Sequence, residues 1–157
     1  MKKLILLLLF IPLVSFGQDL AFIGEKSYPS TVEFGFDNSE ALLFVQFIKD
    51  NENINIVVKT FYGGAGDPKI NGKLVLYLDN GDVIVSDKPT YKDYVDNNVI
   101  SIYPLQANDI KALINSNLNT VRYTIETFAK IAVENKNRTA KNIDKRPLNM
   151  HLSDLIE

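Results

Sequence analysis

Apolar and polar residues alternate along much of the chain with the two-residue period that is typical of half-buried β-strands. Segment 41–48, ALLFVQFI, is apolar on both faces, which favours a central strand and leaves a short buried helix as the alternative. Between two of the alternating segments, Asn80-Gly81 predicts a type I′ turn that closes a hairpin. The other predicted strands are 31–36, 54–62, 70–79, 82–86, 99–103 and 120–128.

The period changes between residues 107 and 115, where Ile110, Leu113 and Ile114 have the i, i+3, i+4 spacing of a helix that packs on a sheet. Residues 137–145 are predicted to be helical, and Pro147 ends that helix before a last turn at 152–157. Residues 89–98 are polar, aromatic and irregular, so we expect a loop there.

Together these elements predict one α+β domain over residues 18–157. Its main part is an antiparallel β-sheet, one short helix at about 107–115 packs on the sheet, and the C-terminal segment is helical. The inward face of the strand at 70–79 carries Leu74, Leu76 and Leu78, which we expect to lie in the core.

Residues 1–17 have the pattern of a signal peptide. Lys2 and Lys3 precede an apolar stretch that is shorter than the roughly 20 residues of a membrane span, and Ser15 and Gly17 provide the small residues of a cleavage site. We therefore expect an exported, periplasmic or extracellular protein whose mature chain begins at Gln18 and has no membrane span.

The ending Leu13-Val14-Ser15-Phe16-Gly17-Gln18 resembles the signal peptides of Bacteroidota. The region from Ile102-Tyr103 through the predicted helix to Val121-Arg122 is similar to a strand–helix–strand pattern in small, uncharacterised secreted β-rich proteins of that phylum. This resemblance implies a compartment and a style of fold, and it implies no activity.

The composition excludes several kinds of chemistry. The chain has 157 residues, no cysteine and a single histidine, so disulfides, thiolate nucleophiles and sites with several histidines cannot form within one chain. A domain of about 140 residues buries enough surface to fold without disulfides. We expect no cofactor, and no feature predicts nucleic-acid binding.

Charge is distributed unevenly. Six basic residues and two acidic residues give residues 130–146 a formal charge of +4, whereas the rest of the mature chain carries −8. In a helix, Arg138, Lys141 and Lys145 would share one face, which could bind a protein or an anionic component of the envelope. A merely solvated face is the alternative.

Tyr91 and Tyr94 lie in the predicted loop and are the other candidates for binding a partner, although aromatic residues also pack at sheet edges. Asp and Asn cluster around 79–87 and 93–98, where turn chemistry explains them as well as calcium binding does. The glycine-rich loop at 61–69 lacks the spacing of a phosphate-binding loop, and the run from His151 to Asp154 lacks a nucleophile elbow.

These features favour an exported non-enzymatic domain that binds a protein or an envelope component. A structural envelope protein and a small carboxylate-dependent hydrolase are the alternatives. The oligomeric state stays open.

Overall fold

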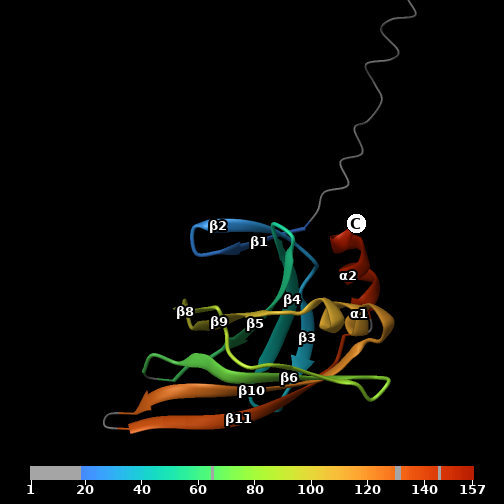
Figure 1. The fold of residues 1–157 in the computed structure, drawn as a ribbon. Helices are drawn as coiled ribbons and strands as arrows, with labels where there is room; N and C mark the ends of the chain where they lie inside the picture. The colour runs from blue at the N-terminus through green and yellow to red at the C-terminus, as the bar shows by residue number, and fades with distance from the viewer. Residues whose placement is uncertain (1–18, 65, 130–131, 145) are drawn as a thin grey trace, which may run out of the picture.

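The structure is a computed structural model that describes residues 19–64, 66–129, 132–144 and 146–157, without the side chains of 129 and 132–137. It confirms the α+β class, with antiparallel strands and two short helices (Figure 1). In chain order the elements are β1 (Asp19–Ile23), β2 (Lys26–Ser30), β3 (Phe34–Asp37), β4 (Leu42–Asp50), β5 (Asn53–Phe61), β6 (Lys69–Leu78), β7 (Val83–Ser86), β8 (Tyr91–Val95), β9 (Asn98–Pro104), α1 (Ala107–Asn115), β10 (Leu118–Ala129), β11 (Ala132–Asn142) and α2 (Leu148–Ile156). The predicted signal peptide lies outside the described residues.

The strands form one antiparallel sheet in the order β7-β6-β10-β11-β3-β4-β5-β9-β8. The sheet curls around its own inner face and brings β9 next to β6, where the Ser101 hydroxyl donates a hydrogen bond of 2.8 Å to the Ile70 carbonyl. The β1–β2 hairpin branches from this path where Ser30 pairs with Ile48 of β4.

The core fills the inner face, as the alternation predicted. Leu74, Leu76 and Leu78 of β6 are all buried there. Helices α1 and α2 lie at one end of the curled sheet, where Leu113 and three leucines of α2 are buried against the core (Figure 1). The leucines of α2 are Leu148, Leu152 and Leu155.

The turn between β6 and β7 differs from the predicted type I′ turn. Of its two central residues only Gly81 has a positive φ, 92°. The Gly81 N–H donates to the Leu78 carbonyl at 3.0 Å, and the Leu78 N–H donates to the Asp82 carbonyl at 2.9 Å. This pattern is that of a three-residue hairpin loop, in which glycine takes the left-handed position after a tight turn.

The prediction of a loop at residues 89–98 was wrong, because Tyr91–Val95 forms the edge strand β8. Asp96 and Asn97, with φ of 51° and 63°, supply the two positive values of a type I′ turn and reverse the chain into β9. Pairing with β9 along the whole of β8 stabilises a segment whose polar side chains hide its strand pattern.

The predicted helix at 137–145 was also wrong. Residues 132–142 form β11, which pairs with β10 along its length and with β3 at Lys141 and Asn142. The long edge of β10 offers hydrogen-bond partners to the backbone along this polar segment. Such pairing with a neighbouring strand overrides helix propensity. The last helix, α2, begins after Pro147 and is longer than the predicted final turn.

Candidate functional site

The outer face of β4, β5 and β9 is covered by the β1–β2 hairpin. Ala21 and Ile23 of β1 pack on Ile48, Val57 and Ile102, and these five residues form a second buried cluster. The hairpin leaves β4 at Ser30, and its turn at Gly24 lies by Tyr91 of β8. The hairpin therefore crosses the strands of the sheet and covers one row of outward residues. By register, Val57, Ile102 and Tyr91 form that row across β5, β9 and β8, and on β4 the hairpin covers Ile48, two residues from the Gln46 that lies opposite Val57.

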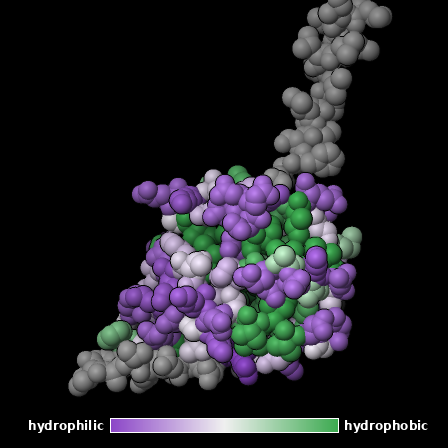
Figure 2. All heavy atoms as spheres, viewed as in Figure 1, coloured by the Kyte–Doolittle hydropathy of each residue, from purple (hydrophilic) through white to green (hydrophobic). Residues whose placement is uncertain are grey.

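A groove runs along each side of the hairpin. The helix-side groove has a volume of about 710 Å³ and extends from Tyr28 on β2 to Gln106, which caps α1. The β1-side groove has a volume of about 550 Å³, and every residue of β1 lines it. Figure 2 shows hydrophobic surface beneath the hairpin and toward the helices, bordered by hydrophilic surface.

The helix-side groove is lined by apolar residues such as Ile48 and Ile102, by amides and tyrosines, by Lys26 and by two exposed carboxylates, Glu25 and Asp50. Asn53 and Asn55 project from the outer face of β5 into it, and Tyr91 closes the end next to β8. Such a lining offers hydrogen-bond donors and acceptors to a polar ligand. Its carboxylates remain in solvent and are not held in a buried cleft.

Tyr91, a predicted partner-binding residue, supports the hairpin turn. Its hydroxyl donates a 2.8 Å hydrogen bond to Asp93 Oδ2, and this bond together with burial raises the pKa of Tyr91. Gly24 has a φ of 59°, and a Cβ at this position would lie 3.2 Å from the Tyr91 hydroxyl oxygen. The positive φ therefore favours glycine in the turn, and a larger residue would also have to displace the Tyr91 hydroxyl by a few tenths of an ångström.

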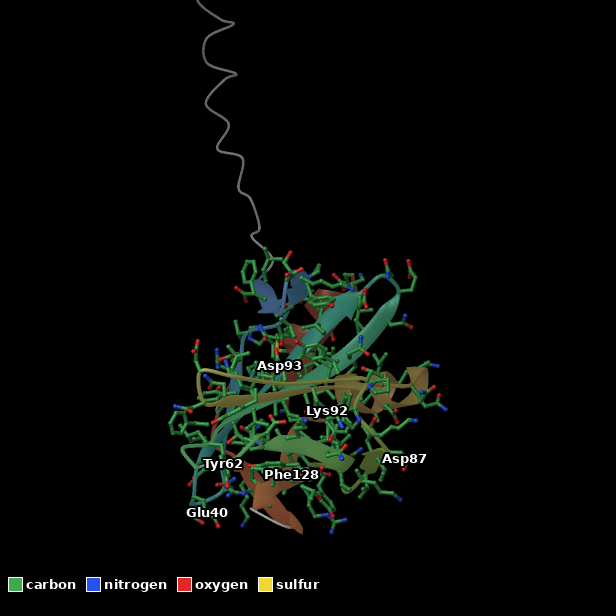
Figure 3. The ribbon with its side chains drawn as sticks, turned by 90° about the vertical axis from the view of Figure 1, so that its left-hand side faces the viewer. Glu40, Tyr62, Asp87, Lys92, Asp93 and Phe128 are labelled. Atoms are coloured by element: carbon green, nitrogen blue, oxygen red, sulfur yellow. The ribbon has the colours of Figure 1, made fainter. Side chains whose placement is uncertain are left out.

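Tyr94, the second predicted tyrosine, points to the opposite face of β8 and packs against the main core. Its hydroxyl lies 3.2 Å from the Tyr62 carbonyl and 3.0 Å from Asn97 Oδ1. Figure 3 shows Lys92 and Asp93 of the same strand between the hairpin above and Tyr62 and Phe128 below. The two tyrosines therefore do not form one binding surface.

Within the described residues, Arg138 and Lys141 do not share the face that a helix would have given them, because their segment is the strand β11. In a strand, residues three apart point to opposite faces, so Arg138 and Lys141 diverge. Arg138 points inward with only 12% of its side chain exposed, and its guanidinium pairs with Glu40 at 2.6 Å. Lys141 is exposed opposite Asp37 of β3, and Lys145 lies outside the described residues.

The remaining candidates have structural roles. His151 packs edge-on against Phe34 with ring centroids 5.6 Å apart, and the Ser153 hydroxyl donates to the Asn149 carbonyl within α2. The glycine-rich segment connects strands β5 and β6. Among the described residues no group of three or more acidic or histidine side chains is placed to hold a metal ion.

The β1-side groove was missed by the sequence analysis. Phe44 and Ile100 form its floor with Lys59, whose ammonium pairs with Glu33 and lies 5.4 Å from the centroid of the Phe44 ring. Beyond this floor the same outer face exposes further apolar side chains at the ends of β4, β5 and β8, and β1 exposes two more. The five residues are Leu20, Phe22, Leu42, Phe61 and Val95, which are 52%, 75%, 44%, 55% and 49% exposed.

A signal for this surface is present in the sequence. Segment 41–48 is apolar on both faces, which is typical of a strand that is covered on both sides. The sequence does not show that the second cover is a narrow hairpin that leaves part of the outer face open.

Comparison of the chain with protein-family models, with curated proteins and with solved structures gives no match. Among the residues that the structure describes, no helix has the length and apolar character needed to cross a membrane.

Proposed function

We propose that this protein is an exported, non-enzymatic domain that binds another protein through the outer face of β4, β5, β9 and β8. The proposal of export depends on the signal-peptide pattern of residues 1–17. The proposal of protein binding depends on the surface beside the β1–β2 hairpin.

The observation that carries the proposal is the row of exposed apolar residues next to the β1-side groove. Leu42, Phe61 and Val95 share the outer face by strand alternation, and Phe61 and Val95 both lie opposite Asn98 in register. Large apolar side chains gathered on one face of a domain are typical of protein interaction sites, in which aromatic residues contribute most of the affinity.

The charge distribution favours a protein over an anionic envelope polymer. Arg138 is withdrawn from the surface by its pairing with Glu40, and Lys141 is opposite Asp37. The apolar outer face instead supports binding by burial of nonpolar area, which contributes about 25 cal/mol for each Å² removed from water.

The test is affinity capture of the tagged mature chain from envelope extracts of the source cells. We expect a protein partner to be recovered with the wild type and lost with the double variant Leu42→Ser, Phe61→Ser. Both side chains are substantially exposed, so the variant should fold normally.

A matched control is the double variant Val83→Ser, Val85→Ser, which removes apolar side chains that are 51% and 49% exposed on the edge strand β7. The control should retain the partner. Equal recovery of the same proteins by all three forms would contradict the proposal and favour a structural envelope role.

A further inference from the structure

Within the part of the chain that the structure describes, one edge of β1 has no partner strand. Within the described residues β1 pairs with β2 alone, residue by residue from Asp19 to Ile23. Every residue of β1 lines the β1-side groove, so the free backbone N–H and carbonyl groups of β1 face this groove. An unpaired strand edge is a ready template for a further strand.

The floor beside this edge fits a strand. Phe44, Lys59 and Ile100 lie side by side across β4, β5 and β9, one row beyond the residues that the hairpin covers. Outward rows of a sheet are about 6.7 Å apart, and neighbouring strands of a ribbon are about 4.8 Å apart. A strand added to β1 would therefore lie above Phe44 and Ile100, both of which are half-buried.

We propose that an extended segment of a partner polypeptide pairs with the free edge of β1 and becomes the third strand of the β1–β2 ribbon. Alternate side chains of the segment would pack on Phe44 and Ile100, and the others would lie beside the exposed Leu20 and Phe22. This inference depends on the proposed function and specifies the part of the partner that is bound: backbone pairing provides affinity, and alternate side chains provide specificity.

A second copy of this domain does not fit the same edge. If β1 paired antiparallel with β1 of a second copy, a twofold axis perpendicular to the ribbon would relate the two copies. Both sheets would then lie on the same side of the ribbon, in the space that the outer faces of β4 and β5 already fill. The segment that pairs with β1 must therefore be an extended stretch of chain with no folded domain packed on the face that points to the sheet.

The charges at the groove favour a segment with a basic residue. Two carboxylates, Asp19 and Glu33, line the groove together with the ammonium of Lys59. Lys59 is paired with Glu33, which leaves Asp19 at the start of β1 as the carboxylate best placed for a cation of the segment. A lysine or arginine on the segment beside Asp19 would complete the charge pairing.

The experiment uses the mature chain with ¹⁵N labelling and a nine-residue capped peptide of alternating valine and threonine with a lysine at each end. We expect the peptide to slow hydrogen exchange of backbone amides in β1, because free N–H groups become hydrogen-bonded. The same peptide with N-methyl groups on alternate residues on its pairing edge should bind about tenfold more weakly or not at all, since it cannot complete the ladder.

A variant at the floor supplies an independent test. Ile100→Ser should weaken peptide binding about tenfold. Because Ile100 also packs against the outer buried cluster, some loss of stability is expected, and circular dichroism must show that the variant is folded at the temperature of the binding measurement. The matched control, Val85→Ser on β7, should bind like the wild type.

Unchanged exchange of the β1 amides at about 1 mM peptide would overturn the inference. Equal binding of the N-methylated peptide would also overturn it. If a partner is nonetheless captured through Leu42 and Phe61, the proposed function survives, and the mode of binding is side-chain docking without strand pairing.

Discussion

The two faces of β4, β5 and β9 are buried by different means. The inner face is enclosed by the rest of the curled sheet and by both helices, so that Val45, Ile56 and Tyr103 are completely inaccessible to solvent. The outer face is covered by a single two-stranded hairpin, which buries Ile48, Val57 and Ile102 and leaves the next rows open. Successive residues of one strand thus lie alternately in the large inner core and in the small outer cluster.

This difference separates the face that stabilises the domain from the face for which we propose partner binding. A large, closed core determines whether the domain folds, and a residue within it is surrounded on all sides. The small outer cluster fixes the position of the hairpin, whose flanking grooves and β1 edge, unpaired within the described residues, form the proposed binding site. The comparison leads to three predictions, given from the largest expected effect to the smallest.

The largest effect is expected for Leu76→Asp on the inner face. Leu76 is 1% exposed, so the variant would bury a charge that has no partner, and we expect the free energy of unfolding to fall by about 4 kcal/mol or more. Circular dichroism during urea unfolding measures this change. A variant that melts like the wild type would show that the inner face of β6 is wrongly assigned.

The alternation of the chain allowed this inner face to be predicted. The strand at 70–79 and the helix at 107–115 were found because their apolar residues follow the period of the element, and both are confirmed as β6 and α1. Burial on one side imposes such a pattern directly on the sequence.

The hairpin that builds the outer site could not be predicted in this way. Residues 19–23 and 26–30 form short strands, and only Ala21 and Ile23 of β1 are buried against the sheet. Their structure depends on contacts with residues distant in sequence, which a local pattern does not contain. The strand β11 was missed for the same reason, since its pairing with β10 is decided by the neighbouring edge.

The second prediction compares the same substitution on the two faces. Ile56 on the inner face and Ile48 on the outer face are 0% and 1% exposed. We expect Ile56→Ala to lower the free energy of unfolding by about 4 kcal/mol, because the enclosed core cannot relax around the cavity. Ile48→Ala should cost about 2 kcal/mol, because the hairpin can settle toward the sheet.

Urea titrations of both variants measure these energies, and hydrogen exchange locates the effect. Ile48→Ala should accelerate exchange in β1 and β2 more than in β6 and β10, whereas Ile56→Ala should accelerate exchange throughout the sheet. Equal losses with the same exchange pattern would mean that the hairpin and the sheet form one core.

The smallest expected effect concerns the loop between β11 and α2, which contacts β3. Arg146 lies in this loop: its guanidinium lies 5.0 Å from the centroid of the Phe34 ring of β3, donates to the Glu33 carbonyl at 2.6 Å and pairs with Asp144. Hydrogen bonds from Arg146 hold the pKa of the Asp144 carboxyl well below its ordinary value of 3.8.

Because the pKa of Asp144 is lower in the folded state than in the unfolded chain, its contribution to stability is fully present above the ordinary value of 3.8. The contribution is lost as the pH falls below that value toward the folded pKa, since the unfolded chain then binds the proton more readily.

We expect Asp144→Asn to cost about 1 kcal/mol at pH 7 and less at about pH 2, as expected for a charged hydrogen bond that is partly exposed. Urea unfolding of the wild type and the variant at both pH values measures the difference. A gap between the two proteins that stays the same at low pH would show that Asp144 acts through its shape and not through its charge.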